Sequence, residues 1–191
     1  MSHTTEFLSE VVEIAKAIEP RAIEVMAYRL DAVRIFAGKV FVIGMGGSLA
    51  NAIHMAADLR KLCNIDAYAP SNIAELTARA NDEGLDTIFT GWLPRLTRDD
   101  CLFVLSVGGG TQNVSKAITE AVKKAKAAKA SILGIVGPVG GITHEMGDHV
   151  LRVPVPESAS SQVTPHTEAF QAVIWHALVS HPLLQRNACK W

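Results

Sequence analysis

The sequence predicts a doubly wound α/β protein in which helices cover both faces of a five-stranded parallel sheet. Short apolar runs rich in β-branched residues alternate with longer segments of helical periodicity. Of the 191 residues, 49% are hydrophobic and only 19% are charged, as expected for a largely buried sheet. Two of the apolar runs end in glycine-rich loops, which is typical of strands that lead into a ligand-binding edge.

The first 36 residues precede any predicted strand. An apolar stripe over residues 5–36, interrupted at Pro20, predicts two helices. Two long helices exceed what simple cover of the sheet requires, so we expect residues 1–37 to form an interface between subunits. The alternative is that they merely cap the same domain. Residues 38–181 would form the α/β core of a single domain that spans residues 1–191.

The first strand is predicted at residues 40–43, and a glycine-rich loop follows it directly. The loop contains Gly46, Gly47 and Ser48 and opens a helical pattern. Glycines let backbone N–H groups approach a ligand, and the N-terminus of a helix carries partial positive charge. The layout is therefore that of an anion-binding turn between a strand and a helix.

His54 and Asp58 lie further along the same predicted helix, four residues apart. Residues at this spacing share one helix face, so a metal-ligand or acid/base pair would project beside the loop. The alternative is an ordinary surface pair of a histidine and an aspartate.

The rest of the chain continues the alternation of strands and helices. Further strands are predicted at residues 65–69, 101–107, 131–136 and 150–153, and helices at 71–80, 85–96, 112–128 and 165–178, with a polar turn at 80–84. The strand at 101–107 leads into a second loop of glycines and Thr111, and both loops would lie at the carboxyl edge of the sheet. Together they indicate a phosphate or sugar phosphate. Neither matches a Walker A loop or GxGxxG, which disfavours a nucleotide.

Composition excludes several classes of partner. The net charge of −1 offers no electrostatic footprint for nucleic acid or an anionic membrane. No apolar run approaches the ~20 residues of a membrane span, and the N-terminal stretch lacks a signal-type apolar core. The three cysteines are widely spaced without a CxxC motif, so we expect neither a disulfide framework nor a cysteine metal site, and a cytoplasmic location.

Four short motifs in order resemble a known family. GMGGS (44–48), HMAAD (54–58), AND (80–82) and SVGGGTQN (106–113) resemble a SIS (sugar isomerase) domain, and more narrowly the phosphoheptose isomerases. The resemblance runs from about residue 5 to residue 180. It implies a three-layer α-β-α sandwich of flavodoxin-like type and a homo-oligomer, expected to be a tetramer.

The resemblance also implies an activity. The chain would be a metal-dependent aldose–ketose isomerase that converts sedoheptulose 7-phosphate to D-glycero-D-manno-heptose 7-phosphate, supplying heptose for surface polysaccharide such as lipopolysaccharide. The alternatives are an isomerase of another sugar phosphate, and a non-catalytic SIS protein of the binding or regulatory kind, such as the one that associates with the bacterial replication initiator.

The resemblance assigns one Zn²⁺ per subunit to His54, Asp58, Glu168 and His176, with proton transfer by Asp58 and His176. Asp58 stands where the family has Glu, and Glu168 where it has Gln. Independently of the family, two imidazoles and two carboxylates are a zinc-compatible ligand set. The alternatives are that His176 is a satisfied core histidine and that Glu168 is an acid in the first turn of its helix.

Glu168 and His176 raise a geometric difficulty. They are eight residues apart, which is roughly 12 Å along an ideal helix and about 80° around it. Both reach one metal only if Glu168 sits at a frayed or bent start, or if one of them comes from another subunit.

The substrate positions implied by the resemblance come from both glycine loops and the AND motif. They are Gly46, Gly47, Ser48, Asn81, Asp82, Ser106, Gly108, Gly109 and Thr111. Met45 replaces a family Asn, and Val107 and Gly108 replace two hydroxyl residues of the family's second loop. Glycine N–H groups can still bind phosphate, but these departures bear on which sugar phosphate is bound.

Overall fold

A computed structural model describes residues 2–190 and contains one parallel sheet of five strands in the order β2-β1-β3-β4-β5. The strands are β1 (Val40–Ile43), β2 (Ala67–Tyr68), β3 (Cys101–Ser106), β4 (Ser131–Val136) and β5 (His149–Arg152). The helices are α1 (His3–Ala17), α2 (Pro20–Ile35), α3 (Gly47–Cys63), α4 (Ile73–Asp82), α5 (Ile88–Trp92), α6 (Lys116–Ala127), α7 (Gly141–Met146) and α8 (Val163–Val179), with 3₁₀ turns η1 (Leu85–Thr87) and η2 (Glu157–Gln162). The predicted parallel α/β fold is confirmed.

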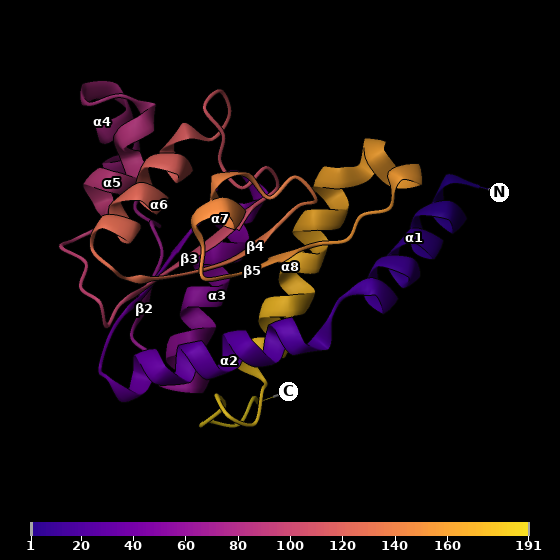
Figure 1. Ribbon diagram of the computed structural model, residues 1–191, viewed down its shortest axis with the longest axis horizontal. Coiled ribbons are helices and arrows are strands. Elements are labelled where there is room, and N and C mark those ends of the chain that lie inside the picture. Colours follow the sequence, from indigo (N-terminus) through magenta and orange to yellow (C-terminus); the bar gives the residue numbers. More distant parts are fainter. Residues whose placement is uncertain (1, 191) are drawn as a thin grey trace.

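The side chains of each strand point alternately to the two faces of the sheet and pack into two hydrophobic cores, one on each face. In β1, Val40 and Val42 pack with α2, α3 and α8, whereas Phe41 and Ile43 pack with α5 and α6. All four residues of β1 and all six of β3 are buried, as expected for central strands covered on both faces. The result is the predicted three-layer sandwich (Figure 1).

Several element boundaries differ from the prediction. β2 is an edge strand of only two residues. α6 begins four residues later than predicted, because Thr111 closes a turn with Val114 through reciprocal backbone and side-chain bonds. The expected helix at 85–96 is a 3₁₀ turn followed by the five-residue α5. α7 and η2 were not predicted, because the glycine- and serine-rich sequence around them is typical of loops.

The two N-terminal helices are only partly packed on the core. α2 buries four apolar side chains against α8 and the sheet, whereas Ile14 is the buried residue of α1. Figure 1 shows α1 at one end of the molecule, beyond the sheet. Among the described helices, none combines the length and apolar character needed to cross a bilayer.

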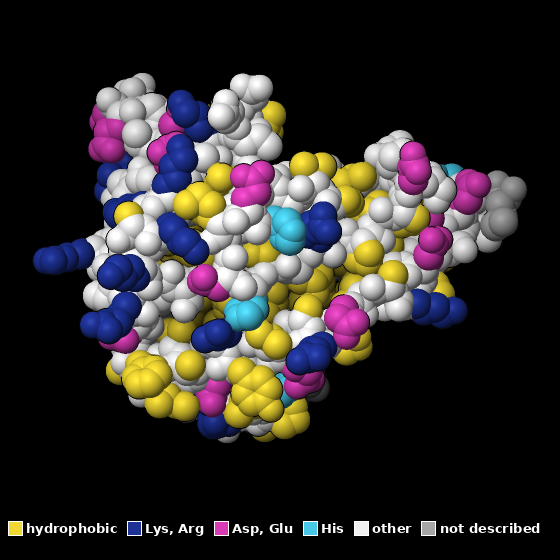
Figure 2. Space-filling view, in the orientation of Figure 1, with side chains coloured by type: hydrophobic (Ala, Val, Ile, Leu, Met, Phe, Trp, Pro, Cys, Tyr) yellow, Lys and Arg dark blue, Asp and Glu magenta, His cyan; other side chains and the backbone are white. Residues whose placement is uncertain are grey.

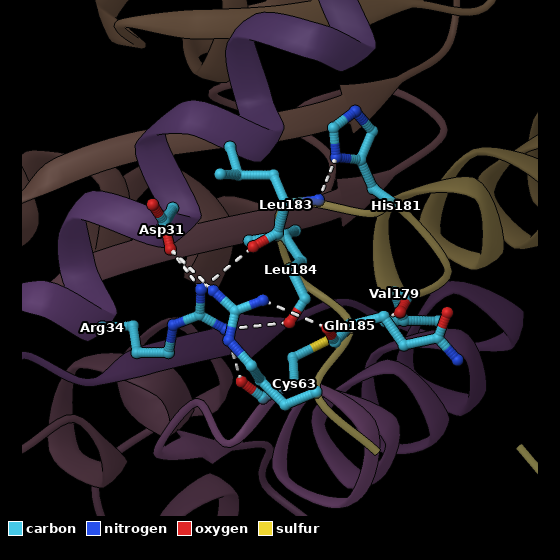
Figure 3. Close-up of polar contacts among 9 residues, drawn as sticks. Asp31, Arg34, Cys63, Val179, His181, Leu183, Leu184 and Gln185 are labelled. Atoms are coloured by element: carbon cyan, nitrogen blue, oxygen red, sulfur yellow. Dashed lines mark hydrogen bonds and ion pairs between the residues drawn. The ribbon is translucent and has the colours of Figure 1, made fainter. Parts of the chain in front are cut away.

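Arg34 of α2 forms hydrogen bonds with the segment that follows α8 (Figure 3). Its guanidinium donates to the carbonyls of Cys63, Leu184 and Leu183 at 2.8, 2.8 and 3.0 Å and is paired with Asp31. The Cys63 carbonyl belongs to the last turn of α3, where helical carbonyls lack partners within the helix. One side chain therefore connects α2, the end of α3 and the C-terminal segment.

Candidate functional site

The loop between β1 and α3 requires glycine for close approach. A Cβ on Gly44 would lie 2.5 Å from the carbonyl oxygen of Ser48, and one on Gly47 would lie 2.3 Å from Oε2 of Glu168. Gly46 has a φ of +60°, a conformation that glycine adopts without strain. Of these three positions, Gly47 is the one that lets the Glu168 side chain of α8 approach the N-terminus of α3.

α3 and α8 pack side by side and run in the same direction. Ser48 contacts Glu168, His54 contacts Trp175 and Cys63 contacts Val179, so residue numbers rise together along both helices. This arrangement brings the C-terminal part of α8, with Trp175 and His176, to the face of α3 that carries His54 and Asp58.

Three of the predicted ligands meet there. Ligand atoms of His54, Asp58 and His176 all lie within 4.8 Å of one another. Nε2 of His54 is 3.5 Å from Oδ2 of Asp58, and the two imidazole centroids are 5.5 Å apart with nearly perpendicular planes. Two imidazoles and one carboxylate form the kind of three-ligand set that holds a catalytic zinc and leaves a fourth position open.

A backbone hydrogen bond fixes the tautomer of His176. Nδ1 lies 2.7 Å from the carbonyl oxygen of Ala172, and a carbonyl only accepts, so Nδ1 carries a proton and donates it to that bond. Nε2 of the neutral ring then offers its lone pair. This is the outer hydrogen bond that commonly orients a metal-binding histidine.

Trp175 holds both histidine rings in place from beneath. It is fully buried, stacks on His176 at a centroid distance of 3.5 Å, and meets the ring of His54 edge-on at 4.7 Å. Both imidazole rings therefore pack against one buried indole ring. The side chain of His54 is nevertheless 59% exposed. The cluster lies on the outer surface of the α3–α8 pair.

Glu168 lies outside the cluster of His54, Asp58 and His176. Its Oε1 accepts hydrogen bonds from the N–H of Ser48 at 3.1 Å and from the hydroxyl of Ser48 at 3.5 Å, and it is not a member of the three-residue cluster. Its assignment as a fourth ligand stays a prediction.

This carboxylate bears on the first glycine loop. The Glu168 carboxylate already accepts the hydrogen bond from the Ser48 N–H at the positive end of α3, which is the position where an anion would bind. A substrate phosphate there would meet a like charge. The roles predicted for Gly46, Gly47 and Ser48 are therefore easier to reconcile with sugar hydroxyls than with the phosphate group.

The second loop uses much of its hydrogen-bonding capacity internally. Ser106 Oγ accepts from the N–H of Gly109 at 3.0 Å. The carbonyl of Gly109 accepts from the hydroxyl of Thr143 at 2.7 Å and from its N–H at 3.0 Å. The hydroxyl of Thr111 is engaged with Val114. Short helix α7, which carries Thr143, therefore fixes the loop's shape.

Gly108 is the open point of this loop. A Cβ on Gly108 would meet no heavy atom within 4 Å, whereas one on Gly109 would lie 1.8 Å from the carbonyl oxygen of Gly140. Backbone N–H groups beside such an opening are suitable phosphate donors.

The two glycines give a matched pair of variants. Gly109→Ala is expected to lower Tm by at least about 5 °C, because the φ of +69° and the clash with Gly140 each strain an alanine. Gly108→Ala should keep the parent Tm and raise KM for a phosphorylated substrate. Thermal unfolding and steady-state kinetics measure both effects, and equal Tm values for the two variants would contradict this description of the loop.

Asn81 and Asp82 are helical, which corrects the predicted turn at 80–84. They form the last residues of α4, and Asn81 Nδ2 donates to Asp82 Oδ1 at 2.7 Å on an exposed surface. Their predicted contact with substrate stays a prediction.

Sequence reasoning missed four residues that shape the site. Trp175 and Thr143 are described above, and Asn51 and Gln171 bridge α3 and α8. Each appears in the sequence as an ordinary helix or loop residue, because its partners come from distant segments. A polar residue within an apolar helical face, such as Gln171, was the available signal.

Comparison with known proteins agrees with the fold and the motifs. A model of the SIS domain matches residues 35–179. The phosphoheptose isomerase of Rhodospirillum rubrum is 36% identical over 148 residues, covering 74% of this chain and 73% of that protein. That of Mycobacterium bovis is 32% identical over 178 residues, covering 90% and 82%.

A solved structure is similar over the same extent. The phosphoheptose isomerase structure from Neisseria gonorrhoeae superposes with a TM-score of 0.79 at 27% identity, covering 93% of this chain and 92% of that one. The family model and the curated relatives span most of the chain, and the architecture is shared. The chain therefore belongs to the SIS domain family and, within it, to the phosphoheptose isomerases, a group of aldose–ketose isomerases.

Proposed function

We propose that this protein interconverts sedoheptulose 7-phosphate and D-glycero-D-manno-heptose 7-phosphate through an enediol or enediolate, using one Zn²⁺ per subunit. The observation that carries the proposal is the cluster of His54, Asp58 and His176 in a chain whose relatives are named phosphoheptose isomerase. The activity would supply heptose for surface polysaccharide and would take place in the cytoplasm.

The cluster fits a zinc ion by its donor chemistry. His54, Asp58 and His176 offer imidazole nitrogen and carboxylate oxygen, and the His176 ring is already oriented by its bond to Ala172. A bound Zn²⁺ would polarise the sugar carbonyl and stabilise negative charge on the neighbouring oxygens. Glu168 would join the set only by leaving Ser48.

The reaction requires two proton movements, and the cluster provides a group for each. Asp58 would take a proton from C1 of the ketose and return it to C2, since its carboxylate has two oxygens and can both bind and exchange protons. His176 would move the proton between O1 and O2. It has only Nε2 to offer, so that atom serves either as ligand or as proton carrier at any one moment.

Proton NMR tests the proposed reaction directly. Purified protein supplied with zinc and sedoheptulose 7-phosphate should produce the anomeric signals of the aldose, with the rate proportional to protein concentration. If this substrate stays unchanged while another ketose phosphate is converted, the isomerase class stands and the substrate assignment is wrong.

Non-catalytic binding of a sugar phosphate is the second candidate. It is favoured by the altered second loop, in which the hydroxyls of Ser106 and Thr111 are bonded within the loop. Saturable binding of several sugar phosphates, with no conversion of any of them at high protein concentration, would support this candidate and contradict the enzyme.

We also propose that the protein is a homo-oligomer, with the N-terminal helices in the interface. Figure 2 shows hydrophobic side chains gathered over α2 at the lower edge of the molecule. Tyr28, Ile35 and Phe36 are 64%, 69% and 68% exposed, and Leu8 and Val12 of α1 are also more than half exposed. An apolar surface of this kind is typical of a protein–protein contact.

Sedimentation velocity measures the consequence. The parent should sediment as a dimer or, as the family resemblance implies, a tetramer. Ile35→Lys combined with Phe36→Lys should shift it toward the monomer, because burying two charges in an interface is unfavourable. A parent that remains monomeric at all accessible concentrations would refute the proposed assembly.

A further inference from the structure

The candidate site depends on the register between two helices. His54 and Asp58 belong to α3, and His176 belongs to α8. A slip of one helical turn, about 5.4 Å, would be larger than the 4.8 Å within which the three ligand atoms lie. Much of the α3–α8 contact is apolar, and the hydrophobic term is non-directional, whereas a hydrogen bond joins two particular atoms.

A pair of amides, Asn51 and the buried Gln171, provides a directional link. Asn51 Nδ2 donates to the carbonyl of Glu168 at 2.9 Å and to Oε1 of Gln171 at 3.2 Å, which uses both hydrogens of the amide group. Gln171 has no exposed surface, and its Nε2 donates to the carbonyl of Ile135 in β4 at 3.5 Å. The link therefore runs from α3 through α8 to the sheet.

Among the described residues, the other polar contacts between α3 and α8 are less suited to fixing the register of the two helices. The Ser48–Glu168 bond ends on a long carboxylate side chain that the proposed metal would compete for. The contact from Cys63 Sγ to the carbonyl of Val179 uses a weak thiol donor. Asn51 instead reaches the backbone of α8 directly and lies one turn before His54.

We propose that Asn51 and Gln171 are positioning residues that set the register of α3 against α8 and so hold His176 within reach of His54 and Asp58. This inference rests on the proposed function, because it takes the cluster to be a metal site. Without Asn51, the amide oxygen of the buried Gln171 would lack its hydrogen-bond partner, which is unfavourable. We expect the two helices to shift to a different register in which this oxygen is paired.

The test uses Co²⁺ as a spectroscopic probe of the cluster. Asn51→Leu and Gln171→Met keep approximate side-chain size and remove the hydrogen bonds. Both variants should bind Co²⁺ at least ~10-fold more weakly than the parent by calorimetry, with an altered visible absorption spectrum, as expected when outer partners of a metal site are lost. In steady-state kinetics, kcat should fall more than KM rises.

Leu59→Ala is the matched control. Leu59 is a fully buried residue of α3 whose loss weakens packing and lowers Tm without removing a directional bond. This variant should keep the Co²⁺ affinity and spectrum of the parent.

Three outcomes separate the two proposals. A parent that binds no Co²⁺ refutes the metal site itself. A parent that binds Co²⁺ with unchanged affinity in Asn51→Leu refutes the positioning role. An equal loss in Leu59→Ala also refutes it, because general weakening of packing would then explain the effect. Asn51 is only partly buried, so its variant should fold and is decisive even if Gln171→Met does not.

Discussion

Asp58→Asn is expected to lower kcat by about 10³-fold or more, because general acid–base groups commonly contribute 10²–10⁴-fold and this one would also bind the metal. The amide keeps the shape of the side chain and removes both its charge and its ability to accept a proton. His176→Ala should have an effect of similar size, since it removes Nε2 from the same cluster.

Stability and control measurements distinguish loss of chemistry from loss of fold. The Asp58 side chain is paired at 3.5 Å with His54, which is 59% exposed, so Asp58→Asn should unfold at nearly the parent temperature. Lys61→Ala, an exposed change one turn further along α3, should keep full activity. If Asp58→Asn and His176→Ala both retained activity within about threefold of the parent, a difference under 1 kcal/mol, the catalytic assignment would be wrong.

Removal of the metal should have the second large effect. Dialysis against a chelator is expected to reduce turnover about 10³-fold, because the cluster without its metal lacks the positive charge that would stabilise the negative charge developing on the sugar oxygens. Addition of one equivalent of Zn²⁺ should restore activity. His54→Ala should lower the zinc content of the purified protein, since one of the three clustered ligands is lost.

Elemental analysis makes this result interpretable. Activity and zinc content should fall together during chelation and recover together on reconstitution. Full activity in protein shown to lack zinc and other divalent ions would contradict a metal-dependent mechanism, whatever the effect of the ligand substitutions.

The central strands could be predicted from the sequence because their signal is local. β1, β3 and β4 are continuous apolar runs, and they lie within one residue of their predicted bounds. β2 could not be delimited, because an edge strand is set by its pairing with a neighbour, here two residues of β1. α7 depends on bonds to the Gly108–Gly110 loop, which no local pattern reveals.

In the candidate site, too, some residues could be paired from the local sequence and others could not. His54 and Asp58 could be paired from their spacing on one helix, whereas His176 entered through the family resemblance and is brought to them by the packing of α8 on α3. The internal bonding of Ser106 and the contact of Glu168 with Ser48 were not foreseeable, because both depend on how the loops fold back on themselves.

Isomerisation of sedoheptulose 7-phosphate in D₂O, followed by NMR, tests the proposed proton transfer through an enediol. Proton transfer through an enediol exposes the moving hydrogen to solvent exchange on Asp58. We predict aldose product with deuterium at C2 and, from the reverse reaction, substrate with deuterium at C1. Complete conversion without deuterium in either compound would indicate direct hydride transfer and would contradict the proposed mechanism.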